Sequence, residues 1–328
     1  MAKAKFSLII AAILFAATLA HAQQDSLPAP ELRQTDLSEK YVKKVLFEAK
    51  WGDGPGEFQL EPMNEIQTWT TYLALDNQGN IYIADPNNYR INIFSQSGNY
   101  INTLVLAESD VIEKNKLPPE NRGDIIQGIG VDSKGHIFVA LSAFGIDLIV
   151  LELDKTGQKV DKYYFPRAWT NDFNLTEDKN NNKYLAGTWF IKDKNYAVGQ
   201  GGEYIYATVP LSFGKINSDK NSVEVVDKIK QIAKQAESLL KYKKFKNGYS
   251  GYYSGSGDVA IKDNKGKIIF KKHHYYLMES HRFTYKPEYS PSVGARIVFD
   301  DEGSFFVVQG KPEGLEVLKY SLRPEDIK

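Results

Sequence analysis

Histidines are the side chains whose spacing in this sequence comes nearest to a metal site. His273, His274 and His281 lie within nine residues, and imidazole is a common ligand of Zn²⁺. In an extended segment the side chains alternate between two faces, so His273 and His281 share a face and His274 lies on the other. We therefore keep His273 and His281 as candidate metal ligands. The sequence predicts no cofactor, with bound Zn²⁺ or Ca²⁺ as the alternative.

Other catalytic patterns are weaker. Asp178, Asn180 and Asn182 have the spacing with which calcium loops begin, but Lys183 replaces the loop's glycine and Trp189 stands where the bidentate glutamate belongs. A hairpin turn explains these residues better. The chain has no cysteine, no Gly-x-Ser-x-Gly nucleophile and no glycine-rich phosphate-binding motif. The sequence leaves enzymatic activity open and favours a protein without it.

Residues 248–257 are rich in glycine and serine and are expected to form a mobile loop, which carries Tyr249, Tyr252 and Tyr253. Rigid aromatic side chains on an adaptable backbone are suited to binding peptides or sugars. The alternative is a tether that only returns the chain to a sheet. The candidate binding residues are these three tyrosines, Arg90 and Trp189.

The elements that must position these residues repeat along the chain. Leu73–Ala84 and Ile129–Ala140 each combine an alternating strand, an Asp-x-x-Gly turn and a second strand rich in β-branched and aromatic residues. Aspartate can bond the turn backbone, and glycine adopts the left-handed conformation that the returning strand requires. Weaker copies begin at Asp178, Asp263 and Asp300, and in the first of these Asn181 replaces the glycine.

The spacing of the copies indicates a β-propeller. Their first aspartates lie 56, 46, 85 and 37 residues apart, and one four-stranded blade takes roughly 40–50 residues. Such hairpins bury their faces only by packing radially against neighbours. We predict an all-β propeller and favour six blades. Five remain open, because the step of 85 residues is either two blades or one blade with an insertion.

The first copy resembles an NHL repeat. It has the glycine-rich lead Gly52–Phe58, the strand pair Leu73–Ala84, an Asp-x-x-Asn-x-Arg turn from Asp85 to Arg90, and a third strand ending in Phe94. The match covers residues 51–105, and the second copy has lost the Asn-Arg turn. The resemblance implies a six-bladed propeller. Relatives of that type include a zinc-dependent amidating lyase with ligand histidines on different blades. This sequence does not reproduce that arrangement, because after the predicted signal peptide only His136 lies outside the 273–281 group.

The two ends of the propeller are expected to meet. After Gly303 the chain supplies two further strands and then ends, so that its last blade lacks an outermost strand. Residues 43–51 read as a strand, placed just before the glycine-rich lead. We predict that this strand completes the last blade and closes the ring.

One segment departs from the β pattern. Apolar residues from Val225 to Leu240 follow a three-then-four spacing, which predicts an amphipathic helix inserted at about residues 224–247. A lid or docking helix is one interpretation. An insertion that packs its apolar stripe on the propeller rim is the one we favour.

The N-terminus predicts export. Lys3 and Lys5 precede an apolar run, and Ala20-His21-Ala22 gives a cleavage site, so residues 1–22 are expected to be a signal peptide. A flexible lead-in follows over 23–38, and residues 39–328 are expected to form a single propeller domain. No later stretch is long enough to span a membrane. We predict a secreted protein, periplasmic or extracellular and bacterial.

The charge balance and the predicted fold limit the functions that the sequence supports. The 41 basic residues balance the 41 acidic ones, whereas nucleic-acid binding favours a basic excess. We therefore predict a monomeric binding or scaffold propeller for a protein, peptide or glycan, without nucleic acid. The alternatives are a metal-dependent lyase or lactonase with its site at the channel mouth, and a structural component of an envelope assembly.

Overall fold

A computed structural model describes the part of the chain that forms the sheets. All of the described residues belong to one compact unit that starts at Tyr41. They are residues 41–59, 61–63, 66–68, 72–106, 126–141, 148–165, 168–170, 173–178, 180–192, 202–216, 227, 229, 231, 243–253, 258–273, 297–311 and 313–323. The predicted signal peptide (1–22) and lead-in (23–38) lie outside them.

The described strands form five four-stranded antiparallel sheets, the blades of a β-propeller, and a two-stranded hairpin. The first blade is β4 (Leu73–Leu75), β5 (Ile81–Asp85), β6 (Arg90–Phe94) and β7 (Tyr100–Val105), and the second is β8 (Ile126–Val131), β9 (Ile137–Leu141), β10 (Leu148–Leu153) and β11 (Lys159–Phe165). The third is β12 (Ala168–Thr170), β13 (Asn174–Glu177), β14 (Lys183–Lys192) and β15 (Gly202–Pro210), and the fourth is β16 (Lys243–Lys244), β17 (Ser250–Tyr253), β18 (Asp258–Lys262) and β19 (Ile268–His273). The fifth is β20 (Val298–Phe299), β21 (Phe305–Lys311), β22 (Gly314–Leu322) and β1 (Tyr41–Lys50), and β2 (Glu61–Met63) pairs with β3 (Ile66–Thr68).

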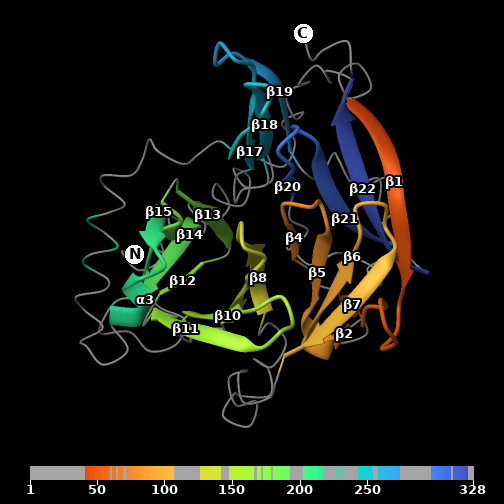
Figure 1. The fold of residues 1–328 in the computed structure, drawn as a ribbon, viewed down its shortest axis with the longest axis horizontal. Coiled ribbons are helices and arrows are strands. Elements are labelled where there is room, and N and C mark those ends of the chain that lie inside the picture. The colour runs from red at the N-terminus through yellow and green to blue at the C-terminus, as the bar shows by residue number, and fades with distance from the viewer. Residues whose placement is uncertain are drawn as a thin grey trace, which may run out of the picture. The chain divides into compact units, whose positions relative to one another are not determined.

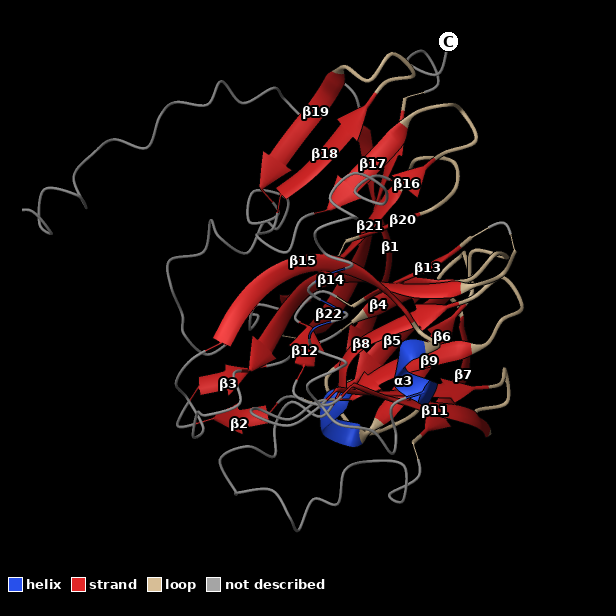
Figure 2. Ribbon diagram, turned by 90° about the vertical axis from the view of Figure 1, so that its left-hand side faces the viewer, coloured by secondary structure: helices blue, strands red, loops and turns tan. Residues whose placement is uncertain are grey.

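The predicted all-β class is confirmed. Figure 2 shows strands nearly everywhere, and the helical elements whose bounds the structure gives are the short α3 (Phe213–Ile216) and the 3₁₀ turn η1 (Pro86–Asn88). Among the described residues no helix is long and apolar enough to cross a membrane.

Five sheets correspond to the lower of the two blade counts that the sequence left open. The Asp263 turn belongs to the second hairpin of its blade, between β18 and β19. The first hairpin of that blade turns at Phe245–Gly248, where Gly248 donates its N–H to the Phe245 carbonyl and has a φ of 84°. This turn has no aspartate, so the Asp-x-x-Gly pattern does not mark it. The 85-residue step therefore runs from the β13–β14 hairpin of the third blade to the second hairpin of the fourth, with no further sheet among the described residues between them.

Ring closure by the N-terminal strand is confirmed. β1 pairs antiparallel with β22 from Tyr41 opposite Leu322 to Lys50 opposite Gly314. Figure 1 shows the red-orange β1 beside the blue β22. The pairing covers the outer edge of β22 and ties the two ends of the described chain together, as closed β architectures require.

The core lies between neighbouring blades. Residues of β5 and β9 are buried throughout, because each of these strands has a neighbouring sheet on both sides. Apolar clusters join the first blade to the second, the second to the third, and the fifth to the first. The fourth and fifth blades meet through the rings of Tyr41, Phe270 and Phe305. Each large side chain buried in this way stabilises the fold by roughly 1.5–3 kcal/mol.

Most of the predicted helical insertion lies outside the described residues. Asp227, Ile229 and Gln231 are helical, and Ile229 is buried in the cluster between the second and third blades. The C-terminal part of the prediction is wrong, because residues 243–247 form β16 and the turn that follows it. Backbone pairing of Lys243 and Lys244 with β17 takes the place of helical bonds there.

The hairpins give each blade two distinct ends. At one end, which we name the tight-turn end, lie the short hairpin turns that follow β4, β6, β8, β10, β13, β16, β18 and β20. Glycines at the last position of these turns have φ near +80°, and Asn181 (φ 63°) takes that position in the third blade, as predicted. The opposite end, the loop end, holds the connection from β5 to β6 and the end of β7.

Candidate functional site

A buried ion pair lies at the loop end of the first blade. Asp85 ends β5, and Arg90 begins β6 after the 3₁₀ turn, which closes through Tyr89 in the left-handed region (φ 51°). The Arg90 Nε lies 2.9 Å from Asp85 Oδ2, and Asn88 Nδ2 donates to the same oxygen. Burial raises the pKa of Asp85, although the bonds from Asn88, Arg90 and the Gln59 amide favour its charged form. The Asp-x-x-Asn-x-Arg turn is thus a closed unit around one carboxylate.

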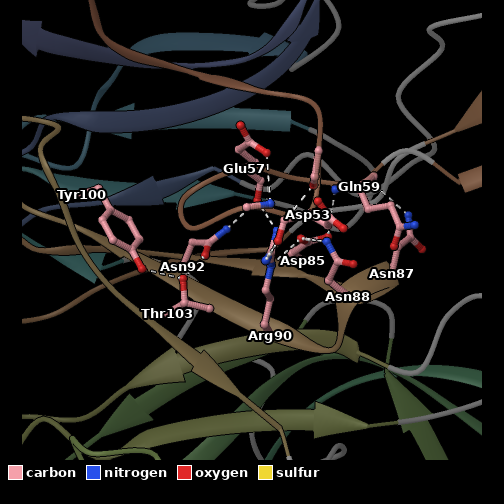
Figure 3. A network of polar contacts seen from close by, with 12 residues as sticks. Asp53, Glu57, Gln59, Asp85, Asn87, Asn88, Arg90, Asn92, Tyr100 and Thr103 are labelled. Atoms are coloured by element: carbon pink, nitrogen blue, oxygen red, sulfur yellow. Dashed lines mark hydrogen bonds and ion pairs between the residues drawn. The ribbon is translucent and has the colours of Figure 1, made fainter.

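Arg90 uses its remaining donors to fix the glycine-rich segment 52–57. Its Nη2 donates to the Glu57 carbonyl at 2.7 Å and its Nη1 donates to the Asp53 carbonyl. Asn92 donates to the Glu57 carbonyl as well, at 2.8 Å. Figure 3 shows Arg90 below the segment, with its donors directed at these carbonyls. The segment is therefore held by charge-assisted bonds from a strand of the first blade.

The same network extends to the outermost strand, β7. The Thr103 hydroxyl donates to Asn92 Oδ1 at 2.6 Å. Because that hydroxyl has one hydrogen, Tyr100 must be the donor in its 2.9 Å bond with Thr103. The Tyr100 ring also packs against Gly56, where an added Cβ would lie 2.9 Å from the ring. A continuous chain of bonds thus connects Asp85 to the edge of the blade (Figure 3).

The edge formed by β7, which we name the β7 edge (Tyr100–Val105), exposes apolar side chains. Tyr100 is 42% exposed, Ile101 51% and Val105 71%. Ile101 is an extra residue in the pairing with β6, because Asn102 pairs with Ile93 and Tyr100 with Phe94. A bulge of this kind twists the start of an edge strand away from pairing. Residues 102–105 keep the regular register, and β6 is their only strand partner among the described residues.

The β7 edge also differs in charge from the other outermost strands. Natural edge strands are commonly protected from pairing by charged residues, lysine above all. β1, β11, β15 and β19 each carry at least one charged side chain, whereas β7, with the sequence YINTLV, has none. Its backbone is therefore the least protected of the five edges.

The predicted binding residues lie apart from one another. Arg90 is 7% exposed, and its donors are directed into the network. Trp189 is fully buried between the second and third blades, where its Nε1 donates to the Ala207 carbonyl. Placing Trp189 at a binding surface was wrong, because the indole fills the core instead. Arg90 positions a candidate site through its contacts.

The tyrosine-bearing stretch is partly a strand. Tyr249 follows the tight turn of the fourth blade, where its N–H donates to Asn247 Oδ1. Tyr252 and Tyr253 belong to β17 and pair with Ala260 and Val259. The prediction of a loop over residues 248–253 is therefore wrong, because backbone pairing orders them. Residues 254–257 lie outside the described part.

The candidate metal ligands are not brought together in the described part of the chain. His273 ends β19, opposite Asp258, and His281 lies outside the described residues. The ranges that the structure covers contain no group of three or more potential metal-ligating side chains.

No motif or spacing in the sequence marks Tyr100, Ile101, Thr103 and Val105 as candidate binding residues. The signal that could have found them is an uncharged run in the strand that ends a blade. Recognising its importance requires knowing which strand is outermost.

Proteins similar to this chain were found among solved structures. No protein-family model matches the chain and no curated protein sequence matches it, so the resemblance to NHL repeats stays a prediction. The PQQ-bound aldose sugar dehydrogenase of Streptomyces coelicolor aligns over 87% of this chain and 99% of its own, with 11% identity and a TM-score of 0.40. A catalytically inactive virginiamycin B lyase from Staphylococcus aureus, solved with quinupristin, aligns over 81% and 99%, with 13% identity and a TM-score of 0.38. A luciferin-regenerating enzyme aligns over 86% and 95%, with 9% identity and a TM-score of 0.35.

Proposed function

We propose that this chain is an exported, monomeric propeller that binds an extended, uncharged segment of a partner polypeptide along the β7 edge. The observation that carries the proposal is the combination of three exposed apolar side chains with the absence of charge on this outermost strand. An added strand would gain backbone hydrogen bonds along residues 102–105 and apolar contacts with Val105.

The network behind the strand supports this function. Asn92, Thr103 and Tyr100 tie β7 to the segment that Arg90 fixes. A strand that is already ordered loses little conformational freedom when a ligand binds, and this favours affinity. The uncharged edge favours a polypeptide over an anionic glycan, because it offers no cation.

The test is a screen of the full propeller against an array of uncharged twelve-residue peptides. Wild-type protein is expected to bind a subset, and binding is expected to change little with salt, since the contacts are apolar and backbone-mediated. Ile101→Lys and Val105→Lys are expected to weaken binding about tenfold or more, which corresponds to about 1.4 kcal/mol. Val160→Lys is the matched control, because Val160 is also an exposed residue (53%) on an outermost strand, and that strand already carries lysines.

Peptides that bind the wild type and the two lysine variants of β7 equally well would refute the proposal. Loss of a wild-type dimer in Val105→Lys, measured by light scattering, would identify a second copy of the chain as the occupant and refute the monomeric part. The metal-dependent alternative remains a prediction of the sequence, which about one equivalent of Zn²⁺ or Ca²⁺ in the purified protein would support.

A further inference from the structure

The tight turns share one structural device, and the second blade departs from it. In the first, second and third blades the turn aspartate (Asp76, Asp132, Asp178) accepts two backbone N–H bonds on Oδ1. In the first and third blades Oδ2 then accepts an asparagine amide and a tyrosine hydroxyl, from Asn80 and Tyr82 or from Asn182 and Tyr184. The second blade has His136 and Phe138 at these two positions.

These two changes redirect the polar contacts of the turn. Phe138 has no hydroxyl, and Asp132 Oδ2 instead lies 3.0 Å from Lys183 Nζ of the third blade. The His136 ring points to Glu152, with Nδ1 2.7 Å from Oε1. The second oxygen of Glu152 accepts the Tyr163 hydroxyl at 2.6 Å. A structural turn has thus become a cluster of titratable groups.

The geometry fixes the tautomer of the neutral histidine. Glu152 is 8% exposed and accepts from Tyr163, whose pKa is raised by burial and by the Glu152 bond, so the phenol keeps its proton. The carboxylate can only accept from His136, and Nδ1 therefore carries the hydrogen. This leaves the Nε2 lone pair as the proton acceptor. No described residue forms a hydrogen bond with Nε2, and the side chain is 30% exposed. A histidine oriented by a carboxylate in this way has the geometry of a general base.

We infer that His136 is a general base at the tight-turn end of the second blade, with Glu152 and Tyr163 as its positioning residues, and that it hydrolyses small uncharged carboxylic esters. Nε2 takes a proton from water, the hydroxide oxygen bonds to the acyl carbon, and the ester C–O bond breaks. The leaving alkoxide receives the proton from Nε2. The ammonium of Lys183 is paired with Asp132 at 3.0 Å and lies 3.9 Å from Glu177, and Glu152 adds a further carboxylate beside His136, so anionic esters are disfavoured. This inference is independent of the β7 edge.

The test uses the full propeller with p-nitrophenyl acetate as the probe. His136→Gln is expected to lower the second-order rate constant about 100-fold, the lower end of general-base contributions. Glu152→Gln, which is isosteric and keeps hydrogen-bonding groups toward both neighbours, is expected to lower it about tenfold and to move the midpoint of the pH–rate profile. His273→Gln is the control for unspecific imidazole catalysis, because His273 lies on β19 of another blade.

A second readout does not depend on turnover. Diethyl pyrocarbonate acylates unprotonated imidazole, and mass spectrometry measures the rate at each histidine. His136 is expected to react faster than His273 in the wild type and more slowly in Glu152→Gln, with unchanged circular dichroism. Equal ester hydrolysis by wild type and His136→Gln, or equal acylation of His136 in wild type and Glu152→Gln, would overturn the inference.

Discussion

Replacing Arg90 with alanine tests whether the NHL-like turn is an anchor for the segment 52–57. The substitution leaves the Asp85 carboxylate, 2% exposed, without its cation and removes the donors to the Asp53 and Glu57 carbonyls. Removing one partner of a buried pair costs about 3–5 kcal/mol. We expect a loss of this size in the free energy of unfolding. Because domains are stable by about 5–15 kcal/mol, Arg90→Ala should remain folded but near its limit.

Arg90→Lys separates charge from geometry. A lysine keeps the positive charge beside Asp85, but its ammonium cannot reach three acceptors in a planar fork. We expect a smaller loss of about 1–3 kcal/mol, the value of a charge-assisted hydrogen bond or two. Urea titration followed by circular dichroism, with linear extrapolation, measures both variants. Lys44→Ala is the control, because Lys44 is exposed on β1 and its loss should change stability by less than about 0.5 kcal/mol.

Hydrogen exchange locates the effect. The Gly52 amide donates to the Phe58 carbonyl and the Phe58 amide donates to the Lys50 carbonyl. In Arg90→Ala these two amides should lose protection ahead of the amides of β5, because the segment is released while the blade stays paired. A loss under about 1 kcal/mol together with unchanged protection over 52–58 would show that the network does not anchor the segment.

Three further predictions follow from the turns and the core. Hydrogen bonds from Thr156 and from the Gln158 amide lower the pKa of Asp154 in the folded protein, below the unfolded value of about 3.9. The ionised Asp154 therefore stabilises the fold above the unfolded pKa, and this stabilisation is lost as pH falls through the folded pKa. Asp154→Asn should therefore be less stable than wild type at pH 7 and equally stable at strongly acidic pH, and urea midpoints that stay apart in acid would contradict this. Burial and the nearby Asp76 raise the pKa of Tyr82 to about 12. In an alkaline absorbance titration Tyr82→Phe should therefore match the wild type through the ordinary tyrosine range at about pH 10 and fall one tyrosinate short of it near pH 12. A divergence already in the ordinary range would show that Tyr82 is an ordinary phenol. Gly251→Ala would place a Cβ 2.4 Å from Phe245 Cζ and 2.7 Å from Phe299 Cε1. Overpacking of this kind lowers the free energy of unfolding by about 1–3 kcal/mol. A thermal midpoint equal to that of wild type would show that the two rings can move aside.

Much of the fold could be predicted from the sequence, because its signals are local. In an Asp-x-x-Gly turn the aspartate bonds amides two and four residues further on, and the glycine adopts the left-handed region that other residues avoid. The closing strand was predictable by counting strands, since the last blade lacked one. Asp85 and Arg90 are five residues apart, so both belong to the NHL-like motif and the pair could be recognised from the sequence.

The rest was decided by contacts between residues far apart in the chain. The Phe245–Gly248 turn is held by backbone bonds and packing, and its lack of an aspartate hid one hairpin from the pattern. Trp189 could have been a surface residue until the second and third blades enclosed it. Arg90 received its role from carbonyls more than thirty residues earlier in the sequence, and His136 from a glutamate sixteen residues later, on the neighbouring strand β10. The sequence by itself determined turns, strands and ring closure, because these depend on backbone conformation and short-range bonds. Only the tertiary structure decided which side chains are buried, which strand edge stays open and which titratable groups meet, because these depend on how the blades pack.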